Sequence, residues 1–426
     1  MPATPFNSTI YEKLFGDEEL SKLMTDEAEI KSILLVEGAL AKVQGLTGMI
    51  PDEAAKAIRK ASFDLKLKPT DLARGTASTG IPVPAFVEAF RVILSDPGYT
   101  KYIHWGVTNQ DVQDMVLALR LRGVSTLLKT RMKKLVKKLG EVSGQHADTP
   151  LAERTWGEIP ETTTYGATVA GWGIPLVVLL ADARRIDAGI CAVSVRGTEL
   201  RKALAKELRM TDPGHSRHST RDHIASYGGW ITQATQQLGK MAEDILQMCE
   251  DGIEEIRLLD RDGNKAEVAV SPPAIIALGR TCSGLNSALQ SSALHRGQRD
   301  GAAWMTEWLV LPQMIFCLGT ALRAAEELLD SFDADTGRML KNIADADRPT
   351  VADILYDELL QDMGEEEARE AVDIIVSTAH TQNRDITHLA IETYPDINFD
   401  HEDLKPNYPG EAPAKARDFA ERAAKL

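Results

Sequence analysis

The stretch VQDMVLALRLRGVSTLLKTRMKKLVKKLGEVSG, residues 112–144, decides the fold of this chain. Its apolar residues recur at helical spacing from one end to the other, which predicts one uninterrupted α-helix. A helix of about 30 residues is about 45 Å long. Because such a helix is stabilised mainly by packing against neighbours of similar length, this stretch predicts a helical bundle.

Three more stretches have comparable length and periodicity: residues 163–190, 223–256 and 271–331. All of these exceed the mean helix length of about 11–12 residues. We therefore expect an all-α protein with three helical domains. Their bounds are residues 1–110 for an N-terminal domain, 111–337 for a central long-helix bundle and 338–426 for a small C-terminal domain.

The ends of the chain carry shorter helical patterns. In the N-terminal region the segment TASTGIPVP, residues 76–84, reads as a loop between helices near 51–60 and 84–95. No region reads as β-rich, and no repeat is evident.

Charge and composition exclude several classes of function. The chain has 63 acidic and 48 basic residues and a net charge of -15. A general nucleic-acid surface needs a dense basic patch, so no nucleic-acid partner is expected. A few inward-facing arginines could still form a local pocket for an anionic substrate.

The remaining sequence signals concern metals and membranes. The cysteines lack metal-ligand spacing and lie in apolar stretches, which predicts buried thiols; they are Cys191, Cys249, Cys282 and Cys317. No His, Asp or Glu group has convincing metal-ligand spacing. The N-terminus does not resemble a signal peptide, and no uncharged apolar run of about 18 residues occurs. We therefore expect a cytoplasmic protein with no membrane partner.

Polar clusters interrupt the helical pattern at four places: YIHWGVTNQDVQD (102–114), ERTWGEIPETTTYG (153–166), GHSRHSTRDHI (214–224) and LHRGQRDGAAWMTEW (294–308). In the first cluster, Thr108 or Asn109 could cap the following helix or help its N–H groups to bind a carboxylate. The second reads as a capped turn or as part of a site, since Arg154, Trp156 and Glu158 add chemistry to its threonines.

The other two clusters also allow two interpretations each. The third is either a solvated loop or an anion-binding segment. The fourth is expected inside a buried helix, where Arg299 and Asp300 would form a structural ion pair or part of a substrate pocket.

Taken in order, these segments resemble the fumarase/aspartase superfamily, and within it the branch of adenylosuccinate lyase and 3-carboxy-cis,cis-muconate cycloisomerase. HWGVTNQDVQD is similar to HWGATSQDVxD, RTWGEIPETTTYG to RTxxQxAxPTTFG, and RHSTRDHIA to WHTQRDRIA. The resemblance extends over nearly the whole chain. It implies a homotetramer with a twenty-helix core, active sites shared between subunits, and no cofactor.

The resemblance also implies a chemistry. A base removes a proton next to a carboxylate, an aci-carboxylate intermediate forms, and a C–N or C–O bond breaks. The carboxylate must be held by donors that stabilise the second negative charge. By position, the substrate-binding residues would be His104, Thr108, Asn109, Thr155, Trp156, Arg221, Lys265 and Arg299, and His218 would contact substrate or transfer a proton.

Two segments depart from the pattern of the family. Trp156 stands at the position where many lyases have a general-acid histidine, and members of the cycloisomerase branch also have tryptophan there. Glu158 replaces a glutamine of the family pattern. The signature loop GSSxMPxKxNP aligns with LLDRDGNKAEV, residues 258–268, which keeps Lys265 but has no serine base. Asp260, or else Glu158, is the candidate replacement because a carboxylate can act as a general base when its environment suits.

The sequence therefore predicts a lyase or cycloisomerase that acts on a small polycarboxylate and resembles the cycloisomerase more than adenylosuccinate lyase. The rival interpretation is a family scaffold that has lost catalysis and has a binding or structural role.

Overall fold

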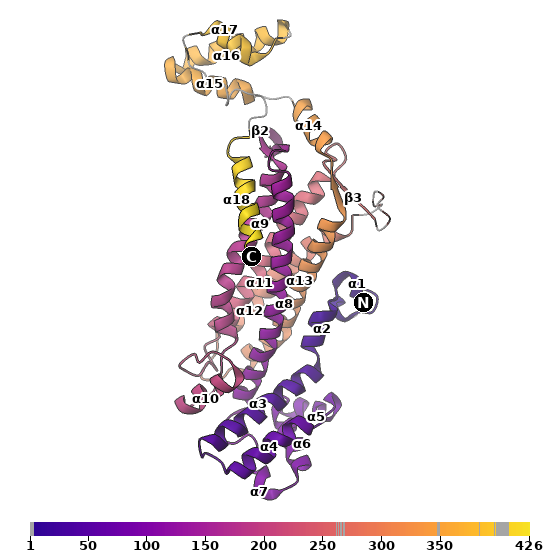
Figure 1. Cartoon of the computed structure of the whole chain (residues 1–426), viewed down its shortest axis with the longest axis vertical. Helices are drawn as coiled ribbons and strands as arrows, with labels where there is room; N and C mark the ends of the chain where they lie inside the picture. The colour runs from indigo at the N-terminus through magenta and orange to yellow at the C-terminus, as the bar shows by residue number, and fades with distance from the viewer. Residues whose placement is uncertain are drawn as a thin grey trace. The chain divides into compact units, whose positions relative to one another are not determined.

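A computed structural model describes residues 4–260, 262, 264, 266, 269–346, 350–382, 384–395, 397 and 409–426. The structure is 72% helical, with 18 α-helices and few strands among the residues just given, so the predicted all-α class is confirmed. Figure 1 labels most of these elements along the chain.

The N-terminal elements are short apart from one helix. They are η1 (Pro5–Asn7), α1 (Glu12–Phe15), α2 (Glu18–Met24), α3 (Asp26–Leu46), α4 (Asp52–Asp64), α5 (Pro69–Thr79), α6 (Val83–Leu94) and α7 (Pro97–Thr100). The predicted loop at 76–84 is partly wrong, because α5 continues to Thr79 and ends at Gly80, whose φ of 80° is readily adopted by glycine.

Five long helices follow, with the shorter α10 (Thr198–Leu208) among them (Figure 1). The long ones are α8 (Asn109–Gln145), α9 (Tyr165–Ile190), α11 (Asp222–Met248), α12 (Ser271–Ser292) and α13 (Gly301–Asp330). The single helical run expected over 271–331 is therefore wrong: it is broken at 293–300, where Gly297 has a φ of 67°.

The remaining elements are two small sheets and the C-terminal helices. The strands are β1 (Pro150–Thr155), β2 (Glu158–Thr164), β3 (Ile256–Leu258) and β4 (Phe332–Ala334), and both pairs are antiparallel. The helices are α14 (Thr336–Asp345), α15 (Thr350–Asp362), α16 (Glu365–Gln382), α17 (Ile386–Thr393) and α18 (Ala412–Ala424).

The chain divides into two compact units, each assembled from three segments. Unit 1 comprises residues 1–133, 178–242 and 270–326, and unit 2 comprises residues 134–177, 243–269 and 327–426. The three-domain division drawn from the sequence stays a prediction.

Unit 1 has an apolar core that extends from α3 to the first turns of α8. Ile33, Phe86 and Val112 are among its fully buried members. Farther along, the Thr232 and Thr235 hydroxyls of α11 contact the buried Cys282 sulfur of α12 at 3.8 Å. Cys282 and Cys317 are buried thiols, as expected, whereas Cys191 and Cys249 are only partly buried.

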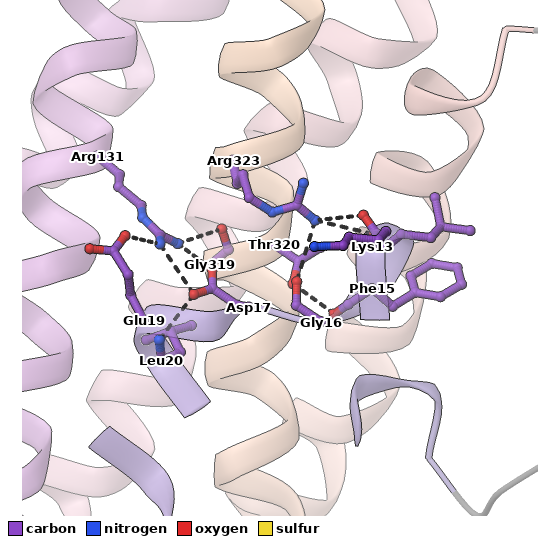
Figure 2. A network of polar contacts seen from close by, with 11 residues as sticks. Lys13, Phe15, Gly16, Asp17, Glu19, Leu20, Arg131, Gly319, Thr320 and Arg323 are labelled. Atoms are coloured by element: carbon purple, nitrogen blue, oxygen red, sulfur yellow. Dashed lines mark hydrogen bonds and ion pairs between the residues drawn. The ribbon is translucent and has the colours of Figure 1, made fainter. Parts of the chain in front are cut away.

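An arginine network fastens the N-terminal segment to α8 and α13 within unit 1 (Figure 2). Arg131 of α8 pairs with Asp17, and it donates to Glu19 at 2.6 Å and to the Gly319 carbonyl at 3.2 Å. Arg323 of α13 donates to the Lys13 and Gly16 carbonyls, each at 3.3 Å. The segment therefore holds together the two helices whose first residues form the pocket described below.

Unit 2 contains two packed regions. In the first, a Cβ at Gly140 would lie only 2.5 Å from the Ala423 Cβ, so α18 can approach α8 this closely only at a glycine. The second is a separate apolar cluster of α15, α16 and α17, with Leu355, Leu359 and Ala390 fully buried.

Two helices are long and apolar enough to cross a membrane by length and composition alone, α9 and α13. Core helices of soluble proteins pass the same test, and 72% of the apolar window in α13 is buried.

Candidate active site

The start of α8 forms one wall of a pocket of about 260 Å³ in unit 1, and Thr108, Asn109 and Arg299 all line it. Arg299 Nη1 donates to the Thr108 hydroxyl oxygen at 2.8 Å. The Thr108 backbone N–H donates to Asp111 Oδ2 at 2.8 Å. The structure thus brings together three of the residues that the sequence identified as carboxylate ligands.

This wall of the pocket is electropositive. The first N–H groups of an α-helix have no intrahelical acceptor, and the helix dipole adds partial positive charge there. In the described part of the chain the backbone N–H groups of Asn109 and Gln110 have no hydrogen-bond partner. With the exposed guanidinium of Arg299 beside them, they form a site suited to a carboxylate.

The opposite wall is the start of α13. Asp300 Oδ1 accepts from the N–H groups of Ala302 and Ala303 at 3.1 and 3.2 Å, and Oδ2 accepts from that of Arg296 at 3.0 Å. These donors hold the pKa of Asp300 below its usual value. The expected burial of this cluster inside a helix is wrong, because Asp300 caps α13 while Arg299 turns to Thr108.

The rest of the pocket is mainly apolar. Ile81, Trp304 and Met305 line it alongside Thr79. The pocket thus offers cationic and N–H donors at one end and an indole and aliphatic surface at the other. This arrangement fits a small anion with an apolar or planar body.

A buried hydrogen bond supports the first turn of α8 from behind. His218 Nε2 lies 2.7 Å from Asp111 Oδ1, and His218 is only 4% exposed. The Gln110 side chain donates to the His218 carbonyl at 3.0 Å. His218 therefore holds Asp111 in place, and Asp111 is the residue that caps the start of α8 by accepting from the Thr108 N–H.

Arg221 lies in a second buried network. It donates to both Glu307 oxygens at 2.8 and 2.6 Å and to Asp114 Oδ2 at 3.0 Å. Arg221 is 2% exposed and Glu307 is 1% exposed. Burial raises the pKa of both Asp114 and Glu307, and the nearby Arg221 opposes this shift.

Sequence reasoning missed the acidic partners of these two residues. Asp111 and Asp114 are three residues apart on α8, and Glu307 lies between Trp304 and Trp308 on α13. Helical spacing places Asp111 and Asp114 on one face, which was the available signal. In the described structure His218 and Arg221 contact these carboxylates and do not line the 260 Å³ pocket.

His104 also pairs with a buried carboxylate. Its Nδ1 lies 2.7 Å from Glu37 Oε1, its Nε2 is buried without a described partner, and its φ is 61°. It does not line the pocket that contains Thr108.

Three other predicted residues lie at the tip of the β1–β2 hairpin in unit 2. Thr155 pairs with Glu158 in register, and Trp156 and Gly157 form the two-residue turn, with φ of 56° and 87°. Positive φ at both positions is typical of a type I′ turn, in which tryptophan is unusual. Trp156 is 100% exposed.

The strand that leads into the altered signature loop is anchored to this hairpin near its turn. Arg154 of β1 donates to both oxygens of the buried Glu255 at 2.9 and 2.7 Å, and Glu255 directly precedes β3. Beyond β3, the exposed Asp260 accepts on Oδ1 from the N–H groups of Asp262 and Asn264, each at 2.9 Å. Asp260 is thus a turn former through one of its oxygens. Lys265 and the Glu158 side chain lie outside what the structure describes.

Comparison with known proteins identifies the family and agrees with the fold. A sequence profile of a family described as lyases matches residues 7–264. The 3-carboxy-cis,cis-muconate cycloisomerase of Pseudomonas aeruginosa is 26% identical over 91% of this chain and 88% of its own length. The nitrosuccinate lyase of Streptomyces davaonensis is 27% identical over 75% of this chain and 73% of its own length.

Solved structures share the architecture. The 3-carboxy-cis,cis-muconate lactonizing enzyme of Pseudomonas putida aligns with a TM-score of 0.86 at 22% identity, over 98% of this chain and 99% of that one. With the family match covering more than half of the sequence, the chain belongs to the lyase family and is an enzyme of the fumarase/aspartase superfamily, which includes lyases and cycloisomerases.

Proposed function

We propose that this enzyme eliminates or cyclises a small polycarboxylate, without a cofactor, through a carboxylate-stabilised carbanion. The observation that carries the proposal is the contact between Arg299 and Thr108 at the open start of α8. It gathers a cation, a hydroxyl and unpartnered N–H groups where one carboxylate would bind.

The chemistry follows from these donors. A base removes the proton on the carbon next to the bound carboxylate, and the electron pair moves into that carboxylate as an aci-carboxylate dianion. Arg299, the Thr108 hydroxyl and the N–H groups of Asn109 and Gln110 stabilise the second negative charge. Donors that act on charge developing in the transition state raise the rate and not only the affinity. Collapse of the dianion then expels the C–N or C–O leaving group with its bonding pair.

The general base is proposed to be a carboxylate, either Asp260 or Glu158. Asp260 would use Oδ2, since Oδ1 is occupied by the turn. Asp260→Asn and Glu158→Gln distinguish the two, because replacing the true base should lower kcat about 100-fold or more while the other variant stays active.

Trp156, Thr155 and Lys265 are proposed to contact the substrate from neighbouring subunits of a homotetramer with shared sites. For His218 and Arg221 we propose a supporting role beneath α8, because each is buried against carboxylates. His104 remains a proposed substrate contact through Nε2.

The names of the relatives define the proposed substrate class. One relative is a cycloisomerase of 3-carboxy-cis,cis-muconate and another is a lyase of nitrosuccinate. Trp156 favours a reaction of the first kind. The rival interpretation of the sequence, an inactive scaffold, has no support from these relatives, because both are named as enzymes.

An ultraviolet-monitored panel tests the proposal. The purified protein is offered 3-carboxymuconate, substituted succinates, and fumarate with ammonia or amines. Arg299→Ala is the test variant, and Arg296→Ala is the matched control, because Arg296 is three residues away and does not line the pocket. We expect a substrate whose kcat/KM falls about 100-fold or more in Arg299→Ala and less than about threefold in the control. Equal loss in both variants would contradict the proposed site.

A further inference from the structure

A second, larger cavity in unit 1 has the opposite character to the pocket at the start of α8. It has a volume of about 660 Å³ and lies among α3, α5, α8 and α13. None of the predicted substrate-binding or catalytic residues that the structure describes lines it, although Trp304 borders both spaces. The proposed carboxylate chemistry therefore does not explain this cavity.

Two hydrogen-bond acceptors of the lining are buried and unsatisfied. Asp114 Oδ1 and Gln113 Oε1 have no hydrogen-bond partner in the described structure, and both residues are 8% exposed. Each has its other polar atom engaged, Asp114 with Arg221 and Gln113 with Glu29. A buried acceptor without a donor is costly, so these oxygens are satisfied best by a ligand that donates hydrogen bonds.

The charge of the lining is negative. Four carboxylates line the cavity, those of Asp26, Glu29, Asp114 and Glu307, against a single lining arginine, Arg120. Arg120 pairs with Glu29 at 2.9 Å. With Arg221, which pairs with both Asp114 and Glu307, these four carboxylates and two arginines carry a net charge of −2. An anion would be repelled here, whereas a cation would be attracted.

The cavity also presents aromatic surface. Trp304 and Trp308, one turn apart on α13, both line it, with ring centroids 4.7 Å apart and planes inclined by 59°. Tryptophan is the best side chain for binding an ammonium group over its ring face. Ile30, Ile33 and Leu117 extend the apolar wall.

We propose that this cavity binds an organic cation: a molecule with a primary ammonium group on an apolar body. The ammonium group donates to Asp114 Oδ1 and Gln113 Oε1, and the apolar body packs against Trp304, Trp308 and Leu117. The assignment does not rest on the proposed function, because the two ligands have opposite charge and largely separate walls.

Calorimetry with phenethylamine on the full-length protein in its native assembly tests the proposal. The neutral 2-phenylethanol and the anionic phenylacetate have the same ring and serve as matched ligands. We expect phenethylamine to bind at least about tenfold more tightly than the alcohol. Its affinity should be unchanged in Arg299→Ala, which separates this cavity from the carboxylate pocket. Equal affinity for amine and alcohol would overturn the proposal.

Variants locate the binding. Leu117→Trp places a bulkier side chain in the cavity without changing its charge and should weaken binding of phenethylamine about tenfold or more. Asp114→Asn removes one negative charge and should weaken binding about tenfold or more. Asp212→Asn is the control, because Asp212 pairs with Arg201 at 2.6 Å outside the cavity. If Asp114→Asn does not fold, Trp308→Leu tests the aromatic wall instead. Undiminished binding in Leu117→Trp would place the ligand elsewhere and refute the assignment.

Discussion

The hydroxyl of Thr108 is available for chemistry because another residue caps α8. In many helices the side chain of the residue before the first turn accepts a backbone N–H bond, as Thr25 does for α3 at 3.1 Å from Ala28. At α8 the cap is instead the bond from the Thr108 N–H to Asp111. Thr108 and Thr25 are therefore a natural pair for separating function from stability.

Replacing each threonine by valine should give opposite results. Thr108→Val removes a proposed donor to the substrate carboxylate, so kcat/KM should fall about tenfold or more with little change in stability. Thr25→Val removes a true cap and should cost about 1 kcal/mol of folding free energy with activity intact. Urea unfolding and the ultraviolet assay measure both. If Thr108→Val loses as much folding free energy as Thr25→Val, the assignment of Thr108 to activity and Thr25 to stability is wrong.

Arg221 is the only described cation that pairs with Asp114 and Glu307. Arg221→Met leaves two carboxylates buried without a counter-charge, which should cost about 3–5 kcal/mol in urea unfolding. The double variant Arg221→Met/Glu307→Leu should recover part of that loss, because it removes one of the stranded charges. If the double variant is no more stable than the single one, the network is not the source of the effect.

His223 should make the protein sensitive to acid. Burial and the charges of Arg221 and Arg217 lower the pKa of His223 to about 2. Because the unfolded chain binds a proton near the ordinary value of 6.5, the stabilising contribution is complete above that pH and is lost as the pH falls, by about 1.4 kcal/mol per unit.

The test compares two histidine variants between about pH 7.5 and 5. His223→Leu should flatten the acid side of the stability profile measured by urea unfolding, whereas the same change at the exposed His215 should leave the slope as it is. If the free energy of unfolding of His223→Leu falls with pH as steeply as that of the parent protein, His223 is not the source of the acid sensitivity.

At the scale of elements, the β1–β2 hairpin presents its least suitable turn residue to solvent. Trp156 has a positive φ, which costs stability that asparagine would restore, and it is fully exposed, so no burial offsets that cost. Trp156→Asn should therefore unfold at the same or a higher temperature while kcat/KM falls about tenfold or more. Gly157→Ala should lower the unfolding temperature, since alanine is strained at a φ of 87°. A joint loss of stability and activity in Trp156→Asn would show instead that the indole has a structural role.

The sequence predicted α8, α9 and most of α11 because each carries an unbroken apolar stripe, but the stretch expected over 223–256 was too long, since α11 ends at Met248. It failed where that stripe continues across a break: Leu294 keeps the helical spacing although it is 82% exposed. Gly297 and the Asp300–Gly301 pair carried the opposing signal, since glycine takes positive φ and aspartate caps the next helix. The hairpin was missed because the three consecutive threonines at 162–164 also read as a capped turn.

For the whole molecule, proximity in space was the part that the sequence could not supply. Thr108 and Arg299 are 191 positions apart, and only their resemblance to family motifs linked them before the structure placed them 2.8 Å apart. Asp114 lies at the end of one such motif, HWGVTNQDVQD, but nothing in the sequence linked it or Glu307 to Arg221. Burial was equally hidden, since nothing in GHSRHSTRDHI distinguishes the buried His218 from the exposed His215.

The proposed tetramer with shared sites makes a prediction at the same scale. Light scattering should give four chains of 46.6 kDa, about 186 kDa. Arg299→Ala and Trp156→Ala should each have strongly reduced activity alone, yet regain part of the activity when they are unfolded and refolded together, because some mixed sites receive no altered residue. A refolded mixture that is no more active than the separate variants would show that one subunit supplies both residues to the same site.

The hydrogen bond between His218 and Asp111 also supplies a spectroscopic probe. An ionised carboxylate can only accept, so the ring proton lies on Nε2, buried and 2.7 Å from its acceptor. Such a proton should resonate far downfield in a one-dimensional proton spectrum and exchange slowly with water. Because Asp111 also caps α8, the position of that line should report whether the first helical turn is intact and whether an anion is bound to it.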